Sequence, residues 1–373
     1  MKKVLLIFGT RPEAIKMAPL VKEFRKHSNE IETVVCVSGQ HREMLDQVLE
    51  CFRIKPDYDL SIMKKGQTLA EITSRLLTSF TEVLDKENPD MIFVHGDTST
   101  AFVSALAGFY KQIPIAHVEA GLRTYDLYSP FPEEFNRQAI DLITKLYFAP
   151  TEYSKTTLLD ERKDREVFVT GNTVIDAINT TVRDDYKHEV LDWAKGSRLV
   201  LLTAHRRENL GDNLHHIFRA IRRVVDEHPD VKVVYPVHLN PVVQQTAQEE
   251  LNNHDRIKLI SPLEVFDFHN FMKASYLILT DSGGLQEEAP HLGKPVLVLR
   301  TTTERPEGVE AGTLKLVGVK EEDIYGEFTK LLDDKDEYSK MSKAVNPYGD
   351  GHASERIVES TIDYFKRSNN DGK

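Results

Sequence analysis

The chain has 373 residues, of which 40% are hydrophobic and 29% charged, and its formal net charge at pH 7 is −11. This length favours two domains and the composition is that of a folded globular protein. The acidic balance argues against a nucleic-acid partner or a basic membrane-binding surface, because both need a cationic face. No apolar run approaches a membrane span of roughly 20 residues or a signal-peptide core, so we expect a cytoplasmic protein.

Short β-rich runs alternate with longer helical stretches in both halves of the chain. This alternation predicts parallel sheets covered by helices on both faces, that is, an α/β fold of two doubly wound, Rossmann-like domains. The expected strands are 4–8, 32–37, 91–94, 115–118, 146–149 and 167–170 in the first half, and 199–203, 231–237, 257–260, 277–280 and 295–299 in the second.

A charged helical connector near 170–192 marks the expected domain boundary. We expect residues 1–170 together with 354–373 to form the first domain, and 171–353 to form the second domain, which binds a nucleotide. The last helix, at about 354–365, has no strand after it and can pack back on the first domain.

Polar residues directly after each strand are the candidates for a site, because ligands of open α/β sheets bind outside the carboxyl ends of the strands. The first strand ends in Gly9-Thr10-Arg11-Pro12-Glu13. This sequence lacks the glycine triplet of a dinucleotide-binding turn. It is either a plain strand-to-helix turn or a turn that places Arg11 and the helix N-terminus beside an anion.

Two later strands end in a histidine and a carboxylate two positions apart, His95 with Asp97 and His117 with Glu119. Side chains two apart in a strand point to one face. Three interpretations stay open: a metal site built from the four side chains, a helix N-cap formed by Asp97, or catalytic carboxylates. Capping does not account for Glu119.

Glu133 and Arg137 follow a turn that contains two prolines, at 129–132. Their i, i+4 spacing is typical of a solvated ion pair on a helix, worth a few tenths of a kcal/mol. The rigid, aromatic-rich turn favours instead a loop that presents Glu133 in a cleft.

The second half offers an anion site. His205 and Arg206 follow its first strand, and either bind an anion or, for His205, serve as a structural histidine. Ser282-Gly283-Gly284 opens a helix whose bare N–H groups suit a pyrophosphate, and Glu287 or Glu288, one turn on, can accept the hydroxyls of a ribose. Two nucleotide-type domains facing across a cleft, with one phosphate cradle, describe the glycosyltransferase-B architecture.

With these motifs in this order, the chain resembles the non-hydrolysing bacterial UDP-N-acetylglucosamine 2-epimerases over essentially its full length. The matching stretches are Phe8 to Met17, Gln40 to Leu45, His95 to Thr98, Glu119 to Arg123, Pro132 to Glu134, Asn136-Arg137, Thr203 to Asn209, Asp281 to Gly284 and Thr303 to Glu307.

The resemblance implies reversible conversion of UDP-N-acetylglucosamine (UDP-GlcNAc) to UDP-N-acetylmannosamine (UDP-ManNAc), for the biosynthesis of a cell-surface polysaccharide. The family eliminates UDP to give a 2-acetamidoglucal and then adds UDP back, returning the proton to the opposite face of C2. Because removal of the weakly acidic C2 hydrogen is coupled to departure of UDP, no redox cofactor and no metal are expected.

The same resemblance assigns roles to individual residues. The expected catalytic residues are Asp97, Glu119, Glu133, Arg137 and His205. The expected substrate-binding residues are Arg11, Lys16, Phe268, Ser282, Gly283, Gly284, Glu288 and Arg305, with Phe268 beside the uracil. Which carboxylate acts on which face of C2 stays open.

Some members of the family are activated by substrate at a second site, with which Gln40, Arg206 and His238 are compatible. The chain departs from strongly activated members at Gly66, where they carry arginine, and at Glu43, where they carry glutamine. The expected partners are UDP-GlcNAc, UDP and a second copy of the chain, since members are commonly homodimers.

Three alternatives to this function remain. A hydrolysing epimerase would release UDP and free N-acetylmannosamine. A glycosyltransferase would not need three carboxylates around one sugar, and a nucleotide-sugar-binding protein without turnover would not need Asp97, Glu119, Glu133 and His205 together.

Overall fold

The computed structural model describes residues 1–39, 42–62, 64, 66–164, 166–303 and 305–371. The chain divides into two compact units, one formed by Met1–Thr180 with Tyr348–Lys373 and the other by Thr181–Pro347. No helix within the described ranges is both long and apolar enough to cross a membrane.

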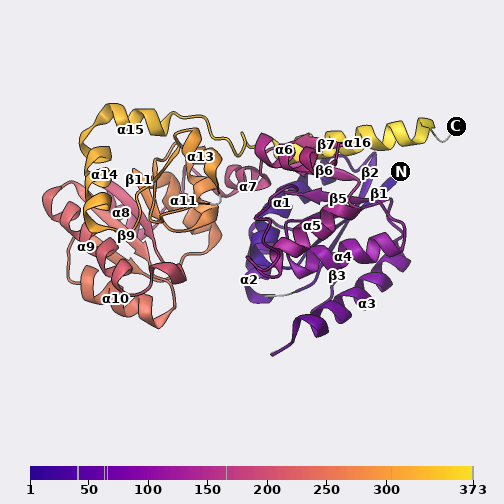
Figure 1. Cartoon of the computed structure of the whole chain (residues 1–373), viewed down its shortest axis with the longest axis horizontal. Helices are drawn as coiled ribbons and strands as arrows, with labels where there is room; N and C mark the ends of the chain where they lie inside the picture. Colours follow the sequence, from indigo (N-terminus) through magenta and orange to yellow (C-terminus); the bar gives the residue numbers. More distant parts are fainter. Residues whose placement is uncertain (40–41, 63, 65, 165, 304, 372–373) are drawn as a thin grey trace. The chain divides into compact units, whose positions relative to one another are not determined.

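The first unit is built on a parallel sheet covered by helices (Figure 1). Its strands lie in the order β3 (Tyr58–Asp59), β2 (Ile31–Val37), β1 (Lys2–Phe8), β4 (Met91–His95), β5 (Ile115–Val118), β6 (Leu146–Ala149) and β7 (Val167–Val169). Its helices are α1 (Arg11–Lys26), α2 (Arg42–Cys51), α3 (Leu69–Glu87), α4 (Ser99–Tyr110), α5 (Glu133–Ile143), α6 (Glu152–Asp160), α7 (Thr173–Thr181) and α16 (Ala353–Asp371).

The second unit repeats this plan. Its strands lie in the order β10 (Ile257–Ile260), β9 (Val231–Pro236), β8 (Arg198–Thr203), β11 (Leu277–Thr280), β12 (Val296–Val298) and β13 (Leu314–Leu316), and all pairs are parallel. Its helices are α8 (Glu189–Ala194), η1 (Arg207–Asn209), α9 (Asp212–Glu227), α10 (Pro241–Leu251), α11 (Val265–Ala274), α12 (Gly283–Glu288), η2 (Ala289–Leu292), α13 (Pro306–Glu310), α14 (Glu321–Asp333) and α15 (Lys335–Ser342).

The prediction of two doubly wound α/β domains is confirmed, and each expected strand is present with ends shifted by at most a few residues. Strands β3 and β13 were not expected. They have two and three residues at the edges of the sheets, and such short runs carry little alternation of apolar and polar side chains. The expected cleft concerns the placement of the two units relative to one another and stays a prediction.

The division between the units differs from the expected boundaries at 170 and 354. Helix α7 joins the first unit because its Asp176 carboxylate accepts hydrogen bonds from the backbone amides of Ala353 and Ser354, at 3.2 and 2.7 Å. The backbone of Asn172 also donates to the carbonyl of Tyr348 at 2.7 Å. Helix α16, yellow in Figure 1, contacts α1, so the chain returns to the first unit at its end.

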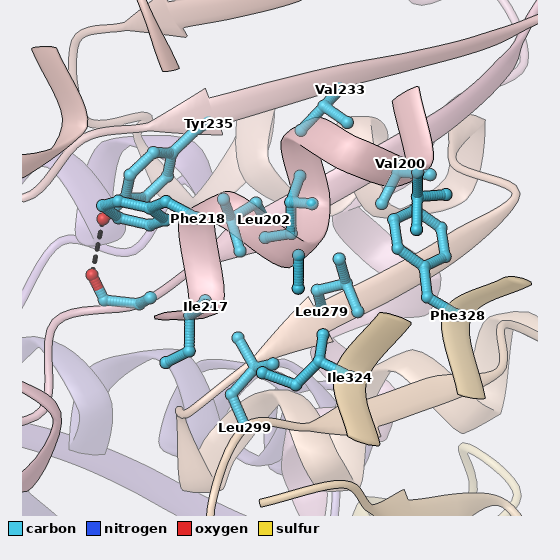
Figure 2. Packing of buried hydrophobic residues seen from close by; sticks show 14 of the residues in the cluster. Val200, Leu202, Ile217, Phe218, Val233, Tyr235, Leu279, Leu299, Ile324 and Phe328 are labelled. Carbon is cyan, nitrogen blue, oxygen red and sulfur yellow. Dashed lines mark hydrogen bonds between the residues drawn. The ribbon is translucent and has the colours of Figure 1, made fainter. Parts of the chain in front are cut away.

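The core of the second unit shows how apolar periodicity makes the layers. Phe218 and Ile217 of α9 and Phe328 and Ile324 of α14 pack on the inward side chains of the central strands (Figure 2). The hydroxyl of Tyr235 donates to the carbonyl of Ala204, which satisfies a polar group inside this core (Figure 2).

The strand order of each sheet reverses beside its first strand, between β1 and β4 in the first unit and between β8 and β11 in the second. A crevice forms at such a switch point because the flanking connections leave it on opposite faces of the sheet. The turns after these four strands are therefore where a ligand site is expected.

Candidate functional site

A buried glutamate ties together the turns after β1 and β4. Helix α1 begins with a capping box, in which the Thr10 hydroxyl caps the helix and Glu13 accepts from the backbone amide of Thr10 at 2.7 Å. Glu13 also accepts from Gly9 N at 3.0 Å and from the Thr98 hydroxyl at 2.7 Å. Burial raises the pKa of Glu13, although these hydrogen bonds act in the opposite direction.

Asp97 lies in the turn between β4 and α4 and forms an ion pair with Arg137. The carboxylate accepts from Arg137 Nε at 2.9 Å and lies 2.7 Å from Nη2. Thr98, not Asp97, caps α4, since the Thr98 hydroxyl accepts from Ala101 N at 3.0 Å. The alternative that made Asp97 a helix N-cap is therefore wrong.

Glu119 follows β5 with a left-handed φ of 65°. Its carboxylate forms an ion pair with Lys16 of α1 and accepts from Asn172 Nδ2 at 2.9 Å. The ring of His95 lies 3.6 Å away. Burial alone would raise the pKa of Glu119, but Lys16 and His95 hold it well below its usual range. Glu119 is thus ionised at neutral pH.

His95 and Arg11, near the ends of β4 and β1, have side-chain nitrogens that are not used in hydrogen bonds within the described part of the chain. His95 is only 4% exposed, and neither of its ring nitrogens has a hydrogen-bond partner among the described residues. Arg11 is the first residue of α1, and its guanidinium forms no hydrogen bond or ion pair within the described part of the chain. Both side chains therefore retain hydrogen-bonding capacity for a ligand.

The turn before α5 leads into Glu133, for which the sequence left two interpretations: an ion pair with Arg137, or a carboxylate presented to a ligand. Arg137 pairs with Glu134 at 3.0 Å and with Asp97, so the alternative of a Glu133–Arg137 ion pair is wrong. Glu134 is buried and accepts from the backbone amides of Thr124 and Tyr125. Glu133 is half-buried, and no side chain in the described ranges forms an ion pair with it.

The geometry does not support the metal alternative. His117 is fully buried, with Nδ1 2.6 Å from the Asp141 carboxylate and Nε2 2.8 Å from the carbonyl of Gly96. Within the ranges that the structure describes, no group of three or more His, Cys, Asp and Glu side chains could hold a metal ion.

In the second unit, a buried aspartate shapes the turn after β8. Asp281 directly follows β11, and its Oδ2 accepts from the backbone amides of His205 and Arg206, both at 2.8 Å, and from Asn209 Nδ2 at 3.0 Å. Arg206 Nε also donates to the carbonyl of Asp281, at 3.1 Å. One carboxylate thus fixes the backbone that presents two cationic or titratable residues.

His205 stacks on His238 with ring centroids 4.9 Å apart and an interplanar angle of 7°. Burial, together with His238 and Arg206, lowers the pKa of His205, although Asp281 acts in the opposite direction. The side chain is 39% exposed, so His205 is not a core histidine of the structural kind. The imidazole is available to a ligand of the second unit.

The expected phosphate cradle and its neighbours lie close together in sequence and space. Ser282 is the N-cap of α12, and Glu288 at the end of that helix lies 3.4 Å from His269. Arg305 donates to Glu287 at 2.7 Å, and Phe268 of α11 packs half-buried on the core of the unit. The small residues of the expected cradle open α12, so their backbone amides lie at a helix N-terminus.

The comparisons with known proteins match one enzyme family. Residues 22–361 match the family model of the UDP-N-acetylglucosamine 2-epimerases. The chain is 62% identical over 364 residues to the UDP-N-acetylglucosamine 2-epimerase of Bacillus subtilis, which covers 97% of this chain and 96% of the relative. This chain belongs to the UDP-N-acetylglucosamine 2-epimerase family. It is an isomerase, and the resemblance to the bacterial family is confirmed.

Solved epimerase structures agree in fold. A putative UDP-N-acetylglucosamine 2-epimerase from Listeria monocytogenes has a TM-score of 0.95 and 54% identity, with 98% of both chains covered. The UDP-GlcNAc 2-epimerase of Neisseria meningitidis, solved bound to UDP-GlcNAc, has a TM-score of 0.85 and 50% identity, with 97% of this chain and 100% of the relative covered. The two α/β units are those of the glycosyltransferase-B architecture shared by these epimerases.

The structure gathers the epimerase site residues predicted from sequence in two groups, one in each unit. Lys16 was expected to hold UDP, and its ammonium lies on Glu119. For the second site, Arg206 and His238 both adjoin His205, while Gln40 lies outside the described residues. The sequence reasoning gave no role to five side chains that hold residues of these groups in place: Glu13, Glu134, Asn136, whose amide donates to the carbonyl of Asp97 at 2.7 Å, Asn172 and Asp281.

Only some of these five carried a signal. Thr10 and Glu13 have the spacing of a capping box, and Asp281 directly follows a predicted strand. The role of Asn172 depends on the path of the chain after β7, which local spacing does not define.

Proposed function

We propose that this epimerase interconverts UDP-GlcNAc and UDP-ManNAc without hydrolysis. A carboxylate removes the C2 proton as the bond between C1 and the UDP oxygen breaks, which leaves a C1=C2 double bond in 2-acetamidoglucal. UDP then adds back to C1, while a second acid delivers a proton to the opposite face of C2. Atoms and charge balance without a redox cofactor.

One observation carries this proposal: carboxylates that follow adjacent parallel strands have separate cationic partners. Asp97 follows β4 and pairs with Arg137, whereas Glu119 follows β5 and pairs with Lys16. An epimerase needs two independently held proton-transfer groups, because the proton leaves one face of C2 and returns to the other. Glu133, near Arg137 on the same helix, is the third candidate.

The second unit is proposed to hold the leaving group. The amides of Ser282, Gly283 and Gly284 would bind the diphosphate, and Glu288 would accept the ribose hydroxyls. His205 and Arg305, with Arg11 of the first unit, would offset the charge that develops on UDP as it departs. The Neisseria relative was solved with UDP-GlcNAc bound, which supports the same ligand here.

We also propose a homodimer, and a product used in a cell-surface polysaccharide. Light scattering on the purified chain tests the first statement. A mass of two chains supports it, and a mass of 42.6 kDa contradicts it. Substrate activation at a second site is tested by whether turnover rises with UDP-GlcNAc more steeply than a hyperbola.

Proton NMR of the purified enzyme with UDP-GlcNAc in deuterated buffer, with a chelator present, tests the reaction. We expect UDP-ManNAc to appear and deuterium to enter C2 of both epimers. Accumulation of UDP and free N-acetylmannosamine would establish the hydrolysing alternative. Epimerisation that retains the C2 proton would rule out elimination with solvent-exchanging acids.

A further inference from the structure

A buried group of charged side chains lies beneath the turns that carry Asp97 and Glu119. His117 of β5 and Asp141 of α5 are both 0% exposed and in contact at 2.6 Å. Arg123 donates to Asp141 Oδ2 at 2.7 Å and to both oxygens of Glu161, at 2.8 and 2.9 Å. The group belongs wholly to the first unit.

The two ends of the His117–Asp141 pair hold the two turns. His117 Nε2 lies 2.8 Å from the carbonyl of Gly96, the residue before Asp97. The Asp141 carboxylate accepts from the backbone amide of Gly121, two residues after Glu119, at 3.3 Å. A single buried pair therefore links the backbones that present both proposed acid–base groups.

Both turns need such support because their backbones are left-handed. Gly96 and Gly121 have φ values of 61° and 89°, and Glu119, which has a side chain, has 65°. A left-handed non-glycine residue is strained and persists only where its surroundings hold it. Gly121 also packs closely on the next helix, since a Cβ there would lie 2.3 Å from the carbonyl oxygen of Ser154.

Hydrogen-bond chemistry determines the protonation of His117. A backbone carbonyl only accepts, so the Nε2 facing Gly96 must carry a hydrogen. Nδ1 faces a carboxylate whose other oxygen already accepts from Arg123 and Gly121. Burial acts to raise the pKa of Asp141, but His117 and Arg123 outweigh it and lower that pKa. The carboxylate is therefore ionised, and both ring nitrogens donate.

We propose that His117 is a positioning residue of this epimerase, held as an imidazolium that aligns the Asp97 and Glu119 turns through its two hydrogen bonds. The inference rests on the proposed roles of those two carboxylates. Charge-assisted hydrogen bonds are about twice as strong as neutral ones. A misplacement of about 1 Å at a reacting group costs about 10²-fold in rate, so alignment matters more than its share of stability.

Nitrogen NMR on protein with ¹⁵N-labelled histidine rings tests the protonation state in the full-length wild type. His117→Gln identifies the signal by its loss. At neutral pH we expect both ring nitrogens of His117 to carry hydrogen, because Nδ1 faces a carboxylate and Nε2 faces a backbone carbonyl. A bare nitrogen on His117 at neutral pH overturns the inference.

Kinetics of His117→Gln test the positioning role. A glutamine side chain offers one amide group and cannot donate to Gly96 while also replacing the charged contact to Asp141. We expect kcat for C2 deuterium incorporation to fall about 10²-fold while the Kd of UDP changes less than about twofold, because the residues proposed to bind UDP are mostly in the second unit. A purely structural role would weaken both together.

His215→Gln is the matched control. His215 also pairs with a carboxylate, Glu250 at 2.7 Å, but belongs to α9 of the second unit and has no proposed role in the reaction. Its turnover is expected to equal that of the wild type. Arg123→Lys serves as the second variant if His117→Gln does not fold, and is expected to lower kcat by a smaller factor with UDP affinity again retained.

The wild-type assay separates the two proposals. Epimerisation by the wild type together with equal turnover by His117→Gln, or by Arg123→Lys in its place, overturns the positioning role alone. A wild type that binds UDP-GlcNAc without converting it overturns the proposed function and, with it, the positioning role.

Discussion

The two switch points share a strand order and differ in what their carboxylates do. In the first unit, Glu119 and Asp97 each face a cation through the side chain, as Glu119–Lys16 and Asp97–Arg137. In the second, Asp281 accepts from backbone amides, and no Lys or Arg among the described residues forms an ion pair with it; the nearest titratable group is the imidazole of His205, whose Nδ1 lies 3.7 Å away. The carboxylates of the first unit therefore form side-chain ion pairs, whereas that of the second unit fixes the backbone of a turn.

This difference indicates that the first unit is suited to proton transfer and the second to binding an anion. An ionised side-chain carboxylate can accept a proton, and separate cationic partners allow the two carboxylates to be positioned independently. A turn shaped by a buried carboxylate and followed by small residues offers N–H groups, which bind an anion without taking part in proton transfer. Substitutions in the two units should therefore fail in different ways.

The largest expected effect is on turnover in the first unit. Glu119→Gln removes a proton acceptor while keeping the side-chain shape, so kcat should fall by about 10³-fold. The Kd of UDP, measured by calorimetry, should stay within about threefold, which is below 1 kcal/mol. Deuterium incorporation at C2 measures the turnover.

Glu152→Gln provides the control for this variant. Glu152 is exposed on α6, pairs with Lys155 at 3.4 Å and has no role in the proposed reaction. It should epimerise at the wild-type rate. Normal turnover by Glu119→Gln would remove the contrast between the two switch points.

The next effect is on the stability of the second unit. Asp281→Ala leaves three N–H donors without their buried acceptor, at about 1–3 kcal/mol each before relaxation, so we expect a loss of about 3 kcal/mol. Urea unfolding measures it. Asp281→Asn keeps one oxygen that accepts and should lose less than half as much. Equal stability of Asp281→Ala and the wild type would show that the turn does not depend on this carboxylate.

Much of the fold follows from the sequence because strands of a parallel sheet are continuous apolar runs. β1 and β8 are such runs, and the polar residues directly after them lie at the carboxyl ends of the strands, as predicted. The edge strand β13 and the membership of α7 could not be predicted in this way. They depend on hydrogen bonds between distant segments, such as Asp176 with Ser354.

The sequence indicated which residues belong to the candidate site better than it indicated which of them form ion pairs with one another. Strand-end logic marks Asp97 and Glu119, but nothing local indicates that Lys16, 103 residues before Glu119, lies on it. The spacing of Glu133 and Arg137 favoured a wrong partner, because Arg137 turns toward Asp97 in a different element. Pairings of this kind come from tertiary packing, which overrides local spacing.

A smaller effect concerns His205, whose pKa in the free enzyme is lowered by burial, His238 and Arg206. Its imidazole should be neutral at pH 7 and take up a proton only below the ordinary histidine value of about 6.5. A diphosphate bound at the Ser282 turn would favour the charged form, so UDP should raise the pKa of His205. NMR titration with and without UDP measures the shift, with His215 as the internal control. An unchanged His205 would place the diphosphate elsewhere.

The smallest expected effect is on the stability contributed by an exposed ion pair, compared with a partly buried pair. Asp350 and Arg356 form a two-point pair like Asp97–Arg137, but their side chains are 57% and 42% exposed. Hydrogen bonds from Arg356 lower the pKa of Asp350 to about 2, compared with about 3.9 in an unfolded chain. The contribution of the pair is therefore present above about pH 4 and is lost as the pH falls from about 4 toward 2.

Solvent screening keeps that contribution small, so Asp350→Asn should reduce the free energy of unfolding at pH 7 by less than about 1 kcal/mol and leave kcat unchanged. The difference from the wild type, measured by urea unfolding, should shrink as the pH falls below about 4. A loss as large as that of Asp281→Ala would mean that an exposed ion pair stabilises this chain as much as a buried carboxylate does. Burial would then not explain the contrast between the two switch points, and only the partners of the carboxylates would distinguish them.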